Sequence, residues 1–102
     1  MRDINDTRAE IDSIDDQIIE LFKRRMDCSM DVAEYKYENN IPILNVQREE
    51  EILSSVQKKG GKYYLYSRML FEEIMSLSRA LQEEYIRRKK AVTTYDRYRF
   101  SF

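Results

Sequence analysis

Apolar residues recur at steps of three, four and seven along the first third of the chain. Residues at this spacing share one face of a helix, because positions three and four apart are neighbours on its surface. No Gly or Pro precedes Pro42. We therefore predict one helix of about 33 residues, roughly 50 Å long at 1.5 Å per residue, with its N-cap at Asn5, Asp6 or Thr7. Its apolar seam consists of Ile4, Ile11, Ile14, Ile18, Leu21, Cys28 and Val32.

Two further helical patterns follow this first one. Residues 39–42 read Asn-Asn-Ile-Pro, which predicts the end of the first helix because Pro cannot easily continue it. Asn45 then suits the N-cap of a second helix, from Val46 to about Lys59. The pair Gly60-Gly61 predicts a turn, after which a third helix should run from Tyr63 or Tyr64 to about Lys89. The apolar stripes are Val46, Ile52, Leu53 and Val56 on the second helix, and Leu70, Ile74, Leu77, Leu81 and Tyr85 on the third.

These patterns predict an all-α fold with a long, a short and a long helix in residues 1–90. Only two Gly and one Pro occur among 102 residues, which leaves little turn chemistry for a sheet. Residues 91–102 have no helical period, and we predict a tail that is either disordered or docked through its aromatic side chains. The first helix is too long for the core of one compact domain. A second copy would cover it, so we predict a homodimer that is either intertwined or a side-by-side antiparallel pair.

Composition excludes several classes of protein. A net charge of −1 creates no field that would recruit nucleic acid or an acidic membrane. No run approaches the roughly 18 apolar residues of a membrane span, and no signal-peptide pattern opens the chain. The single cysteine, Cys28, excludes an internal disulfide framework and favours the cytoplasm. The absence of histidine removes the commonest general base and metal ligand, so we expect no metal site.

Polar residues occupy several positions where the pattern calls for apolar ones. Arg25 falls inside the seam of the first helix, and Glu49 falls on the stripe of the second. Ser78 and Gln82 are four residues apart on the third helix and share one face beside its seam. Charges in apolar surroundings are costly unless an opposite charge meets them. One interpretation is therefore an internal ion pair between Arg25 and Glu49.

The balance of charge favours another interpretation. Glu49 is the only inward-facing acid that the pattern identifies, whereas several cations lie on or beside the apolar faces. An excess of positive charge next to neutral donors suits a bound dianion. We therefore predict an anion site drawn from all three helices. Its cations are Arg8, Arg25, Lys36 and Arg48.

Over residues 5–86 the chain resembles the all-helical chorismate mutases. The resemblance rests on an ordered set of motifs, which are TRAEIDSID, RRM, AEYK, IPILNVQREEEIL and SLSRALQ. It implies an intertwined dimer of three-helix protomers with two equivalent active sites and no cofactor. It also implies conversion of chorismate into prephenate, a step of phenylalanine and tyrosine biosynthesis in the cytoplasm.

The resemblance implies roles for the residues that hold the carboxylates and the ether oxygen of chorismate. Arg8 would reach the partner's site and bind one carboxylate. Arg25 would bind the other carboxylate with help from the Ser78 hydroxyl. Lys36 would bind a carboxylate and the ether oxygen, and Gln82 would donate to that oxygen from the opposite side.

The remaining implied roles concern the ring hydroxyl. Glu49 would accept a hydrogen bond from it, and Arg48 would orient these groups. Asn45 is a departure, since many members carry Asp there, although an amide can still cap the helix and bond the hydroxyl region. The rearrangement transfers no proton and needs no covalent intermediate, so holding the reactive conformer and stabilising charge on the ether oxygen suffice.

Two alternatives to a chorismate mutase stay open from the sequence. An isochorismate-pyruvate lyase of the same fold also needs cations for two carboxylates. Glu49 favours the mutase, because lyases of this type tend to lack a carboxylate there. The other alternative is a non-catalytic helical dimerisation or regulatory module, in which the same charged residues would serve stability alone.

Overall fold

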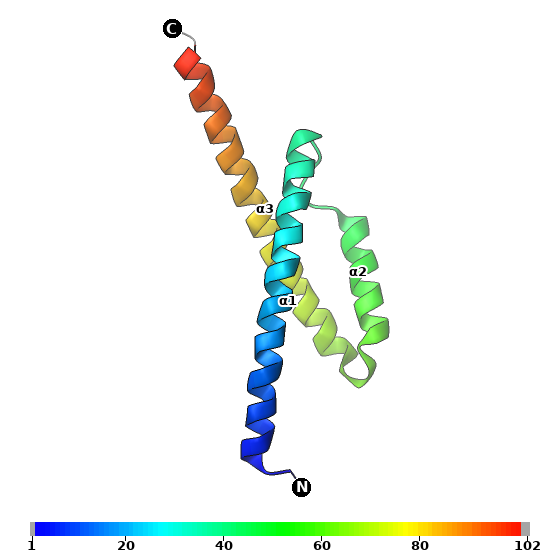
Figure 1. Ribbon diagram of the computed structural model, residues 1–102. Helices are drawn as coiled ribbons and strands as arrows, with labels where there is room; N and C mark the ends of the chain where they lie inside the picture. Colours follow the sequence, from blue (N-terminus) through cyan, green and yellow to red (C-terminus); the bar gives the residue numbers. More distant parts are fainter. Residues whose placement is uncertain (1, 101–102) are drawn as a thin grey trace.

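The computed structural model describes residues 2–100, with side chains for residues 2–92. The described chain forms helices and connecting turns, without a β-strand in that part. This architecture confirms the predicted all-α protomer with a long, a short and a long helix (Figure 1). The elements in order are α1 (Ile4–Glu38), α2 (Val46–Lys59), the short 3-10 helix η1 (Gly61–Tyr63) and α3 (Tyr64–Phe100).

The first helix begins earlier than predicted. Asp3 is the N-cap of α1, and its Oδ1 accepts a hydrogen bond from the Asn5 N–H at 2.7 Å. The prediction of a cap at Asn5, Asp6 or Thr7 is therefore wrong. Each of these residue types can cap a helix, and the outermost one adds a further turn of backbone hydrogen bonds, which begins with Thr7 N–H to Asp3 O at 3.1 Å.

The end of α1 closes as a Schellman motif. Asn40 adopts the left-handed conformation with φ of 54°, which Asn tolerates better than most residues. The Ile41 N–H returns to the Lys36 carbonyl at 2.9 Å, and the Asn40 N–H returns to the Tyr37 carbonyl at 3.4 Å. The helix therefore ends at Glu38 and the chain turns at Asn40, so the helix end predicted at residues 39–42 is confirmed.

The predicted limits of α2 are confirmed. Asn45 is its N-cap, and the Asn45 Oδ1 accepts a hydrogen bond from the Arg48 N–H at 3.0 Å. The helix ends before Gly60, and Gly61 has φ of 57°, a conformation that favours glycine. The glycine pair therefore forms the turn that leads into η1 and α3.

The third helix continues well beyond its predicted end near Lys89. It reaches Phe100 and therefore crosses the predicted boundary between residues 1–90 and 91–102. No Gly or Pro follows Gly61, so the sequence contains no strong stop signal. The loss of the apolar period after Lys89 therefore indicates that α3 extends beyond the core. It does not indicate that the helix ends there. The predicted docking of tail aromatics concerns side chains that lie outside the described residues, as do residues 101–102.

The three helices build a narrow body around a small core. α3 packs against both α1 and α2. The radius of gyration is 19.1 Å, whereas a compact chain of this length has roughly 13 Å. The principal extents are 75 × 30 × 15 Å. Half of the buried residues are polar: the buried set within residues 2–92 is Ser29, Ala33, Leu53, Met75, Ser78 and Gln82.

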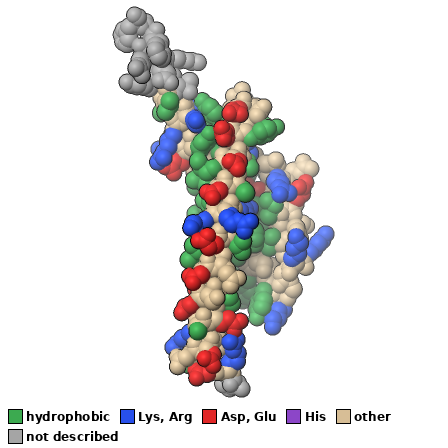
Figure 2. Space-filling view, in the orientation of Figure 1, with side chains coloured by type: hydrophobic (Ala, Val, Ile, Leu, Met, Phe, Trp, Pro, Cys, Tyr) green, Lys and Arg blue, Asp and Glu red, His purple; other side chains and the backbone are tan. Residues whose placement is uncertain are grey.

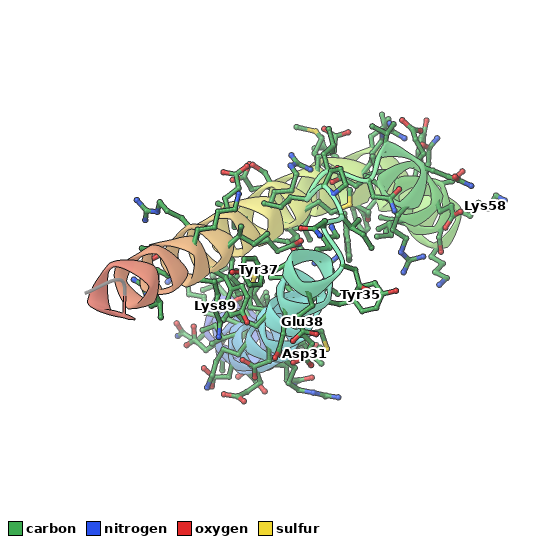
Figure 3. The ribbon with its side chains drawn as sticks, turned by 90° about the horizontal axis from the view of Figure 1, so that it is seen from above. Asp31, Tyr35, Tyr37, Glu38, Lys58 and Lys89 are labelled. Carbon is green, nitrogen blue, oxygen red and sulfur yellow. The ribbon has the colours of Figure 1, made fainter. Side chains whose placement is uncertain are left out.

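Much of the apolar seam of α1 is exposed in a single chain. Ile18 is 56% exposed and Leu21 is 59% exposed, and Leu70 on α3 is 56% exposed. Apolar side chains border α1 on both sides in Figure 2, while acidic ones run along the face toward the viewer. Seen from above in Figure 3, Tyr35 also projects outward from α1. One chain therefore leaves a large part of its apolar surface uncovered. Within the described residues, no helix is both long enough and apolar enough for a membrane span.

Candidate active site

A cavity of about 290 Å³ lies between the three helices. Seven of the eight predicted site residues line it, from all three helices and from the connector that precedes α2. The seven are Arg25, Lys36, Asn45, Arg48, Glu49, Ser78 and Gln82. The other lining residues are Arg79 and the largely apolar set of Cys28, Val32, Ile43, Ile52 and Met75.

Arg8 does not line this cavity. It is exposed and lies within the second turn of α1, near the N-terminal end of the molecule. The cavity instead lies beside the C-terminal half of α1, which contains Arg25 and Lys36. Arg8 therefore cannot complete the site of its own chain from this position, and its predicted role in a partner's site stays a prediction.

Lys36 is held from two sides. Its Nζ donates to the Ile43 carbonyl at 2.5 Å and to the Gln82 Oε1 at 3.1 Å. The Schellman turn makes the first bond possible, because it brings residue 43 back beside the end of α1. Burial lowers the pKa of Lys36 below its usual 10.5, and the charge of Glu49 opposes this in part. An ammonium has three donors, so one N–H remains for an anion in the cavity.

Glu49 pairs with an arginine that the sequence pattern did not single out. The Arg79 Nη1 lies 2.5 Å from the Glu49 Oε1, and both side chains are partly buried. The alternative of an Arg25–Glu49 pair is therefore wrong. Within residues 2–92 the Arg25 side chain makes no ion pair, and it lines the cavity.

Helical spacing could have identified Arg79. It follows Met75 by four residues and precedes Gln82 by three, so all three lie on one face of α3. Ser78, next to it in the chain, was chosen from that same face. The pairing itself was not visible, because the periodicity of one helix says nothing about the side chain that faces it on another.

A chain of hydrogen bonds connects the polar residues on the buried side of the cavity. The Gln82 Nε2 donates to the Ser78 Oγ at 3.1 Å. The hydroxyl oxygens of Ser78 and Ser29 are 2.7 Å apart. The Ser29 Oγ donates to the Arg25 carbonyl at 3.2 Å. Ser29 was not predicted as a site residue, although its position four residues after Arg25 places it on the same face of α1.

The cavity carries an excess of positive charge. Arg25, Lys36, Arg48 and Arg79 line it, whereas Glu49 is the one acid among its lining residues. Arg48 also reaches Glu51 at 3.5 Å on the exposed side of α2. Since cations that are partly withdrawn from water favour an anionic partner, the arrangement suits a ligand with two negative charges. The fold and the cavity thus define an all-α protein with a cavity between its helices that is lined mainly by cations and neutral polar groups.

Comparison with known proteins identifies the family of this chain. The family described as Chorismate mutase type II matches residues 7–83, and the chain belongs to that family. The chorismate mutase of Methanocaldococcus jannaschii is 30% identical over 82 residues, which cover 78% of this chain and 83% of that protein. A solved structure, a conserved hypothetical protein from Pyrococcus furiosus, has a TM-score of 0.64 and 37% identity. It covers 78% of this chain and 93% of its own.

Longer relatives match as well. A bifunctional chorismate mutase/prephenate dehydratase of Buchnera aphidicola from Schizaphis graminum is 31% identical over 103 residues, which cover 98% of this chain. The T-protein of Haemophilus influenzae is 32% identical over 85 residues, which cover 83% of this chain. The chain spans only 27% of the first protein and 22% of the second.

Proposed function

We propose that this protein is a chorismate mutase that converts chorismate into prephenate, in phenylalanine and tyrosine biosynthesis. One observation carries the proposal. A cavity of about 290 Å³ gathers seven of the eight residues that the family resemblance implies, with four cations and one acid. We place the activity in the cytoplasm, which the single thiol of Cys28 supports.

Each group at the cavity has a task in this reaction. Arg25 binds one carboxylate of chorismate, and Lys36 binds a carboxylate together with the ether oxygen. Gln82 donates to the ether oxygen from the opposite side. Glu49, held by Arg79, accepts the hydrogen bond of the ring hydroxyl, and Arg48 with Asn45 orients the same region.

The chemistry needs no proton transfer, because one C–O bond breaks while one C–C bond forms within the same molecule. The protein accelerates it by holding the chair-like reactive conformer, since fixed geometry removes much of the entropic barrier. Charge builds on the ether oxygen as the C–O bond lengthens. Lys36 and Gln82 stabilise that charge with donors that are already oriented.

The proposal includes a homodimer in which Arg8 enters the partner's site. The exposed seam of α1 supports it, because a second α1 packed against that seam would cover Ile18 and Leu21. Arg8 lies away from the cavity of its own chain. In an antiparallel pair, the start of the partner's α1 lies beside the C-terminal half of this α1, where the cavity opens.

An assay for prephenate formation on the purified protein tests the proposed function. We expect prephenate from chorismate without an added cofactor. The same protein is then incubated with isochorismate. Release of pyruvate from isochorismate without prephenate from chorismate would make the protein a lyase instead. Absence of both activities would support the alternative of a non-catalytic helical module.

A carboxylate placed on the seam should dissociate the dimer. Ile18→Asp buries a charge against the partner's apolar seam, which is costly without a partner cation. Sedimentation should then show a monomer or an unfolded chain at concentrations where the wild type is a dimer. Ser13→Asp is the matched control, because Ser13 is exposed on the same helix and lies off the seam. Equal sedimentation of Ile18→Asp and the wild type would contradict the interface.

Plotted against pH, kcat/KM should stay flat between mildly acidic and neutral pH. It should fall only at alkaline pH. Gln82 donates as a neutral amide, so its N–H does not depend on pH. Lys36 must be charged, and burial lowers its pKa below 10.5, so kcat/KM should fall as pH rises through that lowered value. A bound dianion favours the charged form, so the limb of kcat should lie at higher pH. A steep fall between acidic and neutral pH would contradict the donor pair.

A further inference from the structure

We propose that Ser29 is a positioning residue, which orients the Gln82 amide through the Ser78 hydroxyl. The inference rests on the proposed function, since it concerns the donor to the ether oxygen. It also changes the role of Ser78, which the family resemblance implies as a donor to the substrate carboxylate. The observation behind it is a chain of hydrogen bonds that runs from the Lys36 ammonium through Gln82, Ser78 and Ser29 to the Arg25 carbonyl, and whose two central bonds are buried.

The direction of each hydrogen bond follows from counting protons. A serine hydroxyl has one proton to donate and can accept two hydrogen bonds. The Ser29 proton goes to the Arg25 carbonyl at 3.2 Å, the usual bond of a serine to the residue four positions earlier. The 2.7 Å contact between Ser29 and Ser78 therefore uses the Ser78 proton. With that proton directed at Ser29, the Ser78 oxygen is left to accept.

This direction determines which way the Gln82 amide faces. Its Nε2 can approach the Ser78 oxygen at 3.1 Å only as a donor. At the other end its Oε1 accepts from the Lys36 Nζ at 3.1 Å. A flipped amide would place its oxygen on Ser78, whose proton is already used, and its NH₂ group on an ammonium. Both ends of the chain thus select one orientation.

The selected orientation leaves one donor for the substrate. The Gln82 amide nitrogen carries two N–H groups, and within residues 2–92 only one of them has an acceptor, the Ser78 hydroxyl. Gln82 lines the cavity, so the second N–H is the group that can reach the ether oxygen. Ser29, Ser78 and Gln82 are all buried, so water does not compete for these bonds.

Ser29→Ala tests the inference against Ser13→Ala, an exposed serine of the same helix. Without Ser29 the Ser78 proton loses its acceptor and can turn toward Gln82, so only the Lys36 contact still orients the amide. We expect kcat to fall about 5- to 30-fold, the factor that one or two kcal/mol corresponds to. KM should change less than about twofold, because substrate carboxylates are held elsewhere. Ser29→Thr keeps the hydroxyl and should restore most of the kcat.

A double-mutant cycle separates positioning from a purely structural role. In a Gln82→Ala background, Ser29→Ala should change kcat by less than about twofold, since nothing remains to be oriented. An equal loss in both backgrounds would overturn the inference. So would a loss confined to the melting temperature, or an unchanged kcat in Ser29→Ala.

An NMR measurement on the unliganded protein makes the inference independent of activity. The two Nε2 protons of Gln82 should give separate, slowly exchanging signals in the wild type and in Ser13→Ala. In Ser29→Ala they should exchange faster with water. Identical signals in all three proteins would overturn the orienting role of Ser29. Oriented signals in a protein without mutase activity would instead refute the proposed function and leave the role of Ser29 intact.

Discussion

Lys36→Met should lower kcat for the conversion of chorismate by about 10²–10³-fold, or roughly 3–4 kcal/mol, as loss of a preoriented donor typically does. Lys36 contacts both Gln82 and the connector, through the Gln82 Oε1 at 3.1 Å and the Ile43 carbonyl at 2.5 Å. Its removal takes away the charge beside the ether oxygen and one of the two contacts that orient the Gln82 amide. Methionine keeps most of the aliphatic stem, so packing beside Ile43 changes little.

Lys23→Met is the matched control for this substitution. Lys23 lies on the same helix but is exposed, and its contact is a surface pair with Glu20 at 3.0 Å. Exposed pairs of this kind contribute little to stability, so turnover and melting temperature should both stay close to the wild type. If Lys36→Met kept near-wild-type kcat, Lys36 would not stabilise the ether oxygen. If Lys36→Met failed to fold while Lys23→Met folded, Lys36 would be required for the fold, and its role in the reaction would be unsupported.

Two inactive variants should restore activity to each other when they share a dimer. In the proposed dimer, Arg8→Ala lacks the arginine that would enter the partner's site, and Lys36→Met lacks the lysine of its own cavity. A mixed dimer contains one complete site, made of the Arg8→Ala cavity and the arginine of the other chain. Equal mixing and joint refolding should therefore give about a quarter of wild-type activity, because half of the dimers are mixed and half of their sites are complete.

The same mixing experiment can refute the shared site. If Arg8 acts within its own chain, the mixture stays as inactive as its two components. If Arg8 has no role, Arg8→Ala alone keeps its activity. The control mixes Arg8→Ala with Lys23→Met, whose cavity is intact. That mixture should give about half of wild-type activity whether or not subunits exchange, so the formation of mixed dimers is checked separately by native mass spectrometry.

The sequence predicted the limits of α2 well and the outer limits of α1 and α3 poorly. Asn45 and Gly60-Gly61 are single strong signals with no competitor nearby, so local chemistry decides where the chain turns. At the start of α1 several residues could serve as the N-cap, and the outermost of them, Asp3, does so in the structure. After Lys89 no stop signal exists at all, so α3 continues to Phe100 although its apolar period has ended.

The candidate site was predictable residue by residue but not contact by contact. Polar residues on apolar faces pointed to Arg25, Lys36, Glu49 and Gln82, and the structure brings all four to one cavity. Which side chain meets which depends on how helices pack, and the pattern along one helix does not contain that information. Glu49 therefore meets Arg79 instead of Arg25. The same limit applies to the apolar seam of α1. The pattern predicts an apolar face, but it does not identify which surface covers that face.

The connector between α1 and α2 does not behave as an ordinary surface loop. Loops usually tolerate insertions and deletions because their backbone serves only to join two elements. Here the Ile43 carbonyl holds the Lys36 ammonium, and two residues later the Asn45 side chain begins the next helix. One residue more or fewer between Asn40 and Asn45 would displace one of these contacts. Among related proteins that share this lysine, we expect amino-acid replacements in this segment to be common and changes in its length to be rare.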